Sequence, residues 1–164
     1  MATVEVTFTP LPAHVRTARL VATAVARRSG VAESLLDEVR LAVGEACSRA
    51  VEAHLRHCPG EPIRVSLTDD GEQFEVVVTD AVPYAEYGSP PGKATADSHN
   101  GASAGLPAGF AGFGADLAIM DGEVPLRLPD GVGLAVIAGL ADDVRITAAD
   151  PGTSVTMSWK RRAG

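Results

Sequence analysis

The sequence predicts an α/β (α+β) two-layer sandwich, in which helices cover one face of a mostly antiparallel sheet. Segments that alternate polar and apolar residues stand near both ends of the chain, and two long helical patterns follow the first of them. Two turn signals join neighbouring strand patterns into hairpins, which makes the sheet antiparallel. The 164 residues are enough for one core, so we expect a single domain over residues 1–164.

The first third of the chain predicts a strand and two helices. Residues 3–9 (TVEVTFT) alternate polar and apolar side chains, and Pro10 ends that strand. Apolar residues at helical spacing then predict a helix over 13–28, which Ser29-Gly30 terminates. A second, longer helical pattern covers 32–56 and carries an apolar, alanine-rich stripe along one side.

The remaining regular elements are two hairpins and a short helix. Asp69-Asp70-Gly71 and Asp150-Pro151-Gly152 are turn signals, and each lies between two segments with strand periodicity. The expected strands cover 63–68, 73–80, 143–150 and 153–160, and the short helix covers 132–142.

Residues 81–130 differ in character from the rest of the chain. They are rich in Gly, Pro, Ala and Ser, show no sustained period and predict a long loop. A loop of this length within a compact domain usually forms a lid or a disordered insert. A short helix is conceivable over 110–120, and Phe110 and Phe113 either anchor the loop on the domain or belong to the lid.

Composition and charge argue against several classes of function. The formal net charge is -7 and the pI is about 5.0, whereas nucleic acid requires a basic face, so no nucleic-acid partner is expected. No apolar run approaches the roughly 20 residues that span a bilayer, and the first residues do not resemble a signal peptide. Cys47 falls on the second predicted helix and Cys58 just beyond its end, too far apart to pair. We therefore expect a cytoplasmic protein without membrane contact.

Two charged residues interrupt the apolar pattern of the second helix. Glu45 and Arg49 stand one turn apart in LAVGEACSRAVEA (41–53), on a side that flanks the apolar stripe. Spacing alone favours a surface ion pair, worth about 0.2–0.5 kcal/mol. Such a pair is expected to favour the ionised form of Glu45, and it could also occupy the carboxylate oxygens.

The sequence around this pair resembles a known family. LDEVRLAVGEACSRAVEAHL (36–55) is similar to the second helix of bacterial anti-sigma factors, serine-protein kinases with the histidine-kinase-like (GHKL, or Bergerat) ATPase fold. That helix reads approximately L-A-V-x-E-A-x-x-N-A-V in the family. VVVTDA (76–81), DGVGLAVIAGLADDVRI (130–146) and GTSVTMSWKR (152–161) resemble three further family motifs in the same order. The resemblance covers nearly the whole chain except about 84–128.

The resemblance implies a role for the two charged residues. Glu45 stands where the family keeps the base that activates a serine hydroxyl of an anti-anti-sigma factor. Arg49 replaces an asparagine that holds Mg²⁺ on the ATP phosphates. A guanidinium has only donors and Mg²⁺ requires oxygen ligands, which puts Mg²⁺ binding in doubt. Arg49 could instead neutralise phosphate directly.

The adenine side of the implied nucleotide site is altered as well. Asp80 resembles the adenine-binding aspartate, but residues 81–83 (Ala-Val-Pro) follow it where the family has glycines. The alternative is that Asp80 only ends a strand. Thr153, in the closing strand, is implied to bind nucleotide too. We expect any binding of ATP or ADP to be weak.

Two segments resemble phosphate-binding loops. Gly131, Gly133 and Leu134 match the family's glycine-rich loop at the start of a helix, where backbone N–H groups would face phosphate. The alternative is a loop that needs glycine to turn into a helix. GSPPGKAT (88–95) resembles a P-loop with the wrong spacing, and loop composition explains it.

His54, His57 and Cys58 have a helical spacing suited to metal ligands. A structural zinc site needs a fourth ligand, and the sequence offers no obvious one, so we expect no metal site. The alternative is a solvated helix end.

Together these matches predict an anti-sigma factor-like regulator that binds and sequesters a sigma factor and is released by an anti-anti-sigma factor, with ATP binding weakened or lost. The resemblance also implies a homodimer and a partner-facing surface around His14, Arg16 and Arg19. The alternative function is an active ATP-dependent serine kinase that phosphorylates an anti-anti-sigma factor. A third is a scaffold outside sigma control.

Overall fold

The computed structural model describes residues 1–83, 132–149 and 152–161, and the side chains of α3 from residue 135 onward. These residues belong to one compact unit that comprises Met1–Pro90 and Leu128–Gly164. Apart from Ala81–Pro83, the predicted loop over 81–130 lies outside the described residues, with its short helix, its two phenylalanines and the segment 88–95 that resembles a P-loop.

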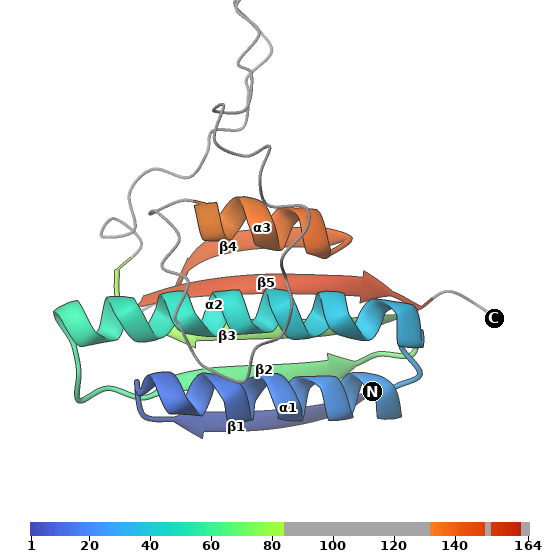
Figure 1. Ribbon diagram of the computed structural model, residues 1–164, viewed down its shortest axis with the longest axis horizontal. Coiled ribbons are helices and arrows are strands. Elements are labelled where there is room, and N and C mark those ends of the chain that lie inside the picture. The colour runs from blue at the N-terminus through green and yellow to red at the C-terminus, as the bar shows by residue number, and fades with distance from the viewer. Residues whose placement is uncertain (84–131, 150–151, 162–164) are drawn as a thin grey trace, which may run out of the picture. The chain divides into compact units, whose positions relative to one another are not determined.

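Five strands form one sheet in the order β1-β2-β3-β5-β4 (Figure 1). Every neighbouring pair is antiparallel, which confirms the prediction from the two hairpin signals. The strands are β1 (Ala2–Phe8), β2 (Ile63–Asp69), β3 (Gln73–Asp80), β4 (Asp143–Ala149) and β5 (Gly152–Lys160).

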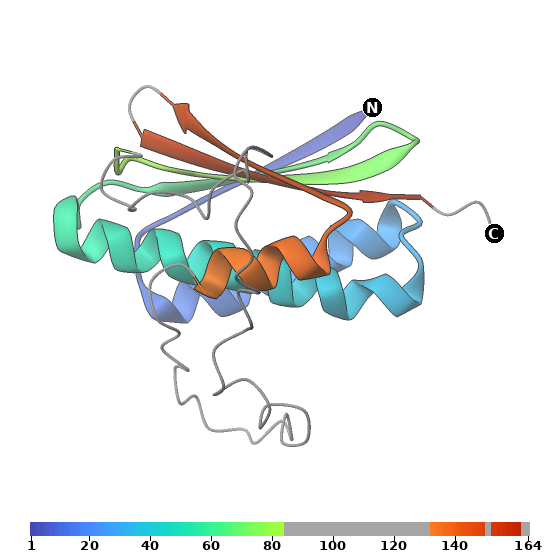
Figure 2. The same ribbon diagram turned by 90° about the horizontal axis from the view of Figure 1, so that it is seen from above.

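The helices lie on one side of this sheet, as Figure 2 shows. They are α1 (Pro12–Arg28), the 3₁₀ turn η1 (Glu33–Leu35), α2 (Leu36–His57) and α3 (Val132–Leu140). Pro12 is the first residue of α1, where its missing N–H costs nothing, so the helix begins one residue earlier than predicted. The long predicted helix begins instead with η1 and becomes α-helical at Leu36. The two-layer prediction is confirmed.

The core lies between the sheet and the alanine-rich sides of α1 and α2. Because side chains alternate along a strand, β2 and β3 each direct every second residue toward the helices. Small residues on both helices let α1 and α2 pack closely against each other and against the sheet. The buried residues of this core include Ala18, Ala22, Ala42, Ala46, Ile63, Val65, Leu67, Phe74, Val76, Val78, Met157 and Trp159.

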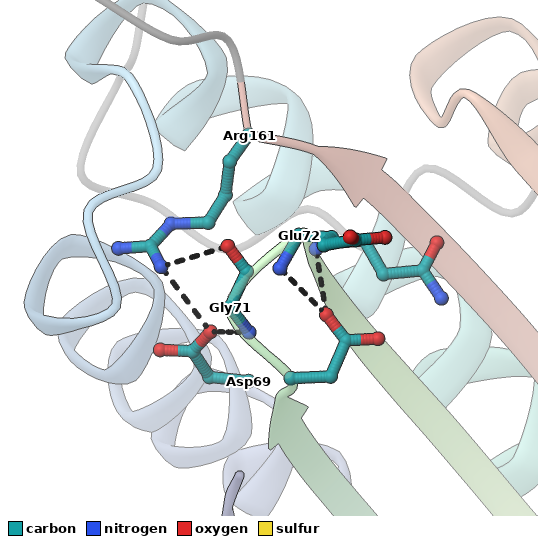
Figure 3. Close-up of polar contacts among 6 residues, drawn as sticks. Asp69, Gly71, Glu72 and Arg161 are labelled. Carbon is teal, nitrogen blue, oxygen red and sulfur yellow. Dashed lines mark hydrogen bonds and ion pairs between the residues drawn. The ribbon is translucent and has the colours of Figure 1, made fainter.

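The predicted turn between β2 and β3 is present and is tied to the end of β5 (Figure 3). Arg161 donates to the carbonyl of Gly71 at 3.2 Å and lies 3.6 Å from the carboxylate of Asp69. Its backbone N–H donates to the carbonyl of Glu72 at 2.9 Å. Asp70 accepts the N–H groups of the two residues that follow Gly71, and these bonds hold the pKa of its carboxyl below the ordinary value. The turn therefore joins three strands.

Candidate nucleotide site

Glu45 lies on α2 and is partly buried. Burial is the largest influence on it and raises the pKa of its carboxyl above the ordinary value; the nearby Glu52 acts in the same direction. Arg19 and Arg49 oppose this shift without reversing it. Arg49 thus favours the ionised form of Glu45, as expected, but the loss of water around the carboxyl outweighs the cation one turn away, and the net pKa is raised.

Arg19 reaches across from α1 to the backbone of α2 beside Glu45. A side chain at Gly44 would collide with Arg19, whose Cδ and Cζ would each lie 3.0 Å from its Cβ. Glycine at this position therefore lets the Arg19 side chain lie directly over α2. This contact explains why the charge of Arg19 acts to lower the pKa of both Glu45 and the buried Cys47.

Asp80 and Thr153 face each other across the β3–β5 pair. Both are buried, with 4% and 2% of their surface exposed. Oδ1 of Asp80 accepts the N–H of Val82 at 2.8 Å, and Oγ1 of Thr153 donates to the carbonyl of Val82 at 2.8 Å. Asp80, implied to bind adenine, and Thr153, implied to bind nucleotide, are thus neighbours, and the side chains of both bond the backbone of Val82.

Gly152 makes this close arrangement possible. Its φ of +132° is disfavoured for every residue with a side chain. A Cβ at this position would clash with the carbonyl oxygen of Asp80 and would lie 2.9 Å from Cα of Ala81. The start of β5 can therefore approach the end of β3 only because residue 152 is glycine.

His54 of α2 also belongs to this region, although a solvated helix end was the alternative expected there. It is fully buried, so the description of this helix end as solvated is wrong for His54. Its Nε2 accepts the N–H of Ala81 at 2.9 Å, and its Nδ1 lies 2.9 Å from the carbonyl of Glu61. A carbonyl can only accept and an amide N–H can only donate, so these partners assign the proton to Nδ1.

The position of His54 was detectable in the sequence, since it continues the stripe of Val43, Cys47 and Ala50 along α2. Both of its ring nitrogens bond backbone groups, which leaves neither for a metal ion. Within residues 1–83, 132–149 and 152–161, no group of three or more His, Cys, Asp or Glu side chains is placed to hold a metal. Cys47 and Cys58 are both free thiols.

The predicted phosphate loop is only partly described. Gly131 lies outside the described residues. Gly133 and Leu134 belong to the first turn of α3, which begins at Val132 and packs against α2. The helix starts within the glycine-containing segment rather than after it.

The three residues expected to face a partner differ in their surroundings. His14 packs edge-on against Phe8, with ring centroids 6.1 Å apart, and its Nδ1 lies 3.0 Å from the carbonyl of Thr9. These contacts hold the turn between β1 and α1. Arg16 and Arg19 are exposed, although Arg19 also covers Gly44.

Comparisons with known proteins agree with this fold. Residues 8–159 match the family model of the histidine kinase-like ATPase domain. The crystal structure of the RsbU and RsbW domains of Rv1364c from Mycobacterium tuberculosis is similar, with a TM-score of 0.59 and 16% sequence identity. The similarity covers 98% of this chain but 32% of that chain, so this domain spans about a third of its length. No curated protein matches the sequence.

No helix in the described part of the chain is long and apolar enough to cross a membrane. The five-stranded antiparallel sheet, the helices on one of its faces and the family match over nearly the whole sequence lead to one conclusion. The chain belongs to the histidine kinase-like ATPase domain family and has a GHKL-like fold.

Proposed function

We propose that this domain is an anti-sigma factor-like regulator that binds and sequesters a sigma factor, is released by an anti-anti-sigma factor, and has weakened or lost ATP binding. Family membership and the likeness to a structure containing an RsbW domain support this proposal. The net charge of -7 suits a partner with a basic face. Such a regulator would act in the cytoplasm, as a homodimer.

The presence of Arg49 on α2 is the single observation on which the proposed loss of nucleotide affinity rests. Arg49 stands one turn after Glu45, where the resemblance implies an asparagine that ligates Mg²⁺. Asparagine offers a carbonyl oxygen, whereas a guanidinium carries five N–H donors and no acceptor. Mg²⁺ binds through oxygen ligands in near-octahedral geometry and is repelled by a fixed cation. The residues present therefore do not fit the metal that the family uses.

The active kinase remains the second candidate, and one observation favours it. A general base works best when its pKa is near the working pH, and burial raises the pKa of Glu45 in that direction. Glu45 would take the proton of a serine hydroxyl on an anti-anti-sigma factor. If Arg49 neutralised phosphate directly, this chemistry would need no asparagine.

The partner surface is proposed to include the outer side of α1, around His14, Arg16 and Arg19. The exposure of the two arginines supports this assignment. A scaffold outside sigma control would share the fold and lack sigma binding. Gel filtration of the domain with each purified sigma factor of its own cell separates the two, because only a regulator would form a complex that an anti-anti-sigma factor dissolves.

Calorimetric titration with ATP and ADP, with and without Mg²⁺, tests the nucleotide proposal. We expect Arg49→Asn to strengthen Mg²⁺-dependent ATP binding about tenfold or more over the wild type, since removal of a cation and gain of a ligand act together. Arg40→Asn is the matched control: Arg40 is on the same helix and pairs with Asp37 at 3.3 Å. Micromolar, Mg²⁺-dependent binding by the wild type, with no gain in Arg49→Asn, would instead support the kinase.

A further inference from the structure

The backbone that leaves β3 is held by side chains from three different elements. Val82 bonds Asp80 of β3 through its N–H and Thr153 of β5 through its carbonyl, each at 2.8 Å. The preceding N–H, that of Ala81, bonds His54 of α2 at 2.9 Å. The side chain of Val82 is itself buried, with 1% of its surface exposed. We call Ala81-Val82 the strap.

The strap presents to Asp80 and Thr153 the two groups that an adenine edge would present. The 6-amino group of adenine is a donor and the adjacent ring nitrogen N1 is an acceptor. Likewise, the N–H of Val82 donates to the carboxylate of Asp80, and the carbonyl of Val82 accepts from the hydroxyl of Thr153. A carboxylate can accept several bonds, but a threonine hydroxyl has one proton, and that proton is used by the strap.

We propose that the strap is an internal competitor for adenine, so that a nucleotide binds only after Val82 leaves Asp80 and Thr153. The inference deepens the proposed function, and rests on it for the assignment of these two residues to the adenine side of the site. The apparent affinity for a nucleotide is then the intrinsic affinity reduced by the fraction of molecules in which the strap is open. A variant that opens the strap raises that affinity without a change in any nucleotide-binding residue.

Val82→Gly is the variant that tests this prediction. It keeps the backbone N–H and carbonyl but removes the buried side chain and adds backbone freedom, so the open fraction rises. With adenosine as the probe in calorimetry, we expect binding about tenfold tighter than in the wild type. Val31→Gly is the matched control, because Val31 is another buried valine, 7% exposed, in the connection near the opposite end of α2.

Hydrogen exchange of the Ala81 and Val82 amides reports on the strap itself. Both amides are bonded within the domain, so they should exchange slowly in the free protein. Saturating adenosine should speed the exchange of the backbone amide of residue 82 in the Val82→Gly variant. Equal adenosine affinity in the folded variant and the wild type, or an amide of residue 82 that stays protected in the variant when adenosine is bound, would overturn the proposal. Val82→Ala gives the same comparison with a smaller loss of packing if the glycine variant does not fold.

The probe separates this inference from the proposed function. Adenosine has no phosphate and needs no metal, so its binding does not depend on Arg49. If Val82→Gly does not change the affinity for adenosine, the proposed sigma binding and the expected effect of Arg49→Asn on ATP binding are unaffected. Failure to bind any sigma factor would leave the adenosine result equally intact.

Discussion

Gly152→Ala should destabilise the domain severely, because two strands touch at this glycine. A Cβ would clash with the carbonyl oxygen of Asp80 and lie 2.8 Å from its carbonyl carbon, well inside ordinary contact distance. The backbone must also hold a φ of +132°, which costs about 1–3 kcal/mol for a residue with a side chain. Separation of β5 from β3 to relieve the clash would also break the bond from Thr153 to the carbonyl of Val82, at about 0.5–1.5 kcal/mol.

These contributions sum to about 1.5–4.5 kcal/mol, a large part of the 5–15 kcal/mol that stabilises a typical domain. Urea unfolding followed by circular dichroism measures the change, and the midpoint should fall by roughly 1–2 M. Gly139→Ala is the control: a Cβ there meets nothing within 4 Å, and alanine favours the helix, so stability should not fall. A Gly152→Ala variant within about 0.5 kcal/mol of the wild type would refute the reasoning, since such values are typical of substitutions away from strained or packed sites.

Three further predictions address the buried polar groups. The folded pKa of Glu45 lies above its ordinary value of 4.5, so the native state loses stability as the pH rises from about 4.5 through the raised pKa. Glu45→Gln should therefore be more stable than the wild type in urea unfolding at pH 7, and this gain should vanish below about pH 4.5. His54→Leu should cost about 1–3 kcal/mol in urea unfolding, because it leaves two backbone groups without partners, whereas the exposed His57→Leu should change little; equal effects would argue against the bonds. Burial raises the pKa of the Cys47 thiol to about 12, so a thiol reagent should label Cys58 in the native protein and Cys47 only in urea; native labelling of both would contradict the placement of Cys47 in the core.

Local patterns predicted most of the regular structure. Strand alternation located β2 and β3 to within a residue, and Asp69-Asp70-Gly71 correctly predicted the turn between them. These features depend on neighbours in the chain, and a sequence displays them directly. The family was also recognisable, because several motifs occur in the expected order over nearly the whole chain.

The net pKa shift of Glu45 was not predictable from the helix alone. The spacing to Arg49 reveals the attractive charge, but burial of Glu45, the position of Glu52 and the reach of Arg19 from α1 arise only when the helices pack. The hydrogen bonds of His54 were likewise not predictable from the helix alone. Its place on the apolar stripe was visible, yet its partners Glu61 and Ala81 are brought to it by the fold.

By itself, the sequence determined the elements, the two-layer antiparallel class and the family, since each is a property of residue order or residue chemistry. Only the tertiary structure placed β5 between β3 and β4, and so set Thr153 opposite Asp80. That pairing joins segments separated by more than seventy residues, whose contact depends on the packing of the whole sheet. The bonds from Val82 to both side chains follow from that packing, because a buried polar group must find its partner wherever the fold brings one within reach.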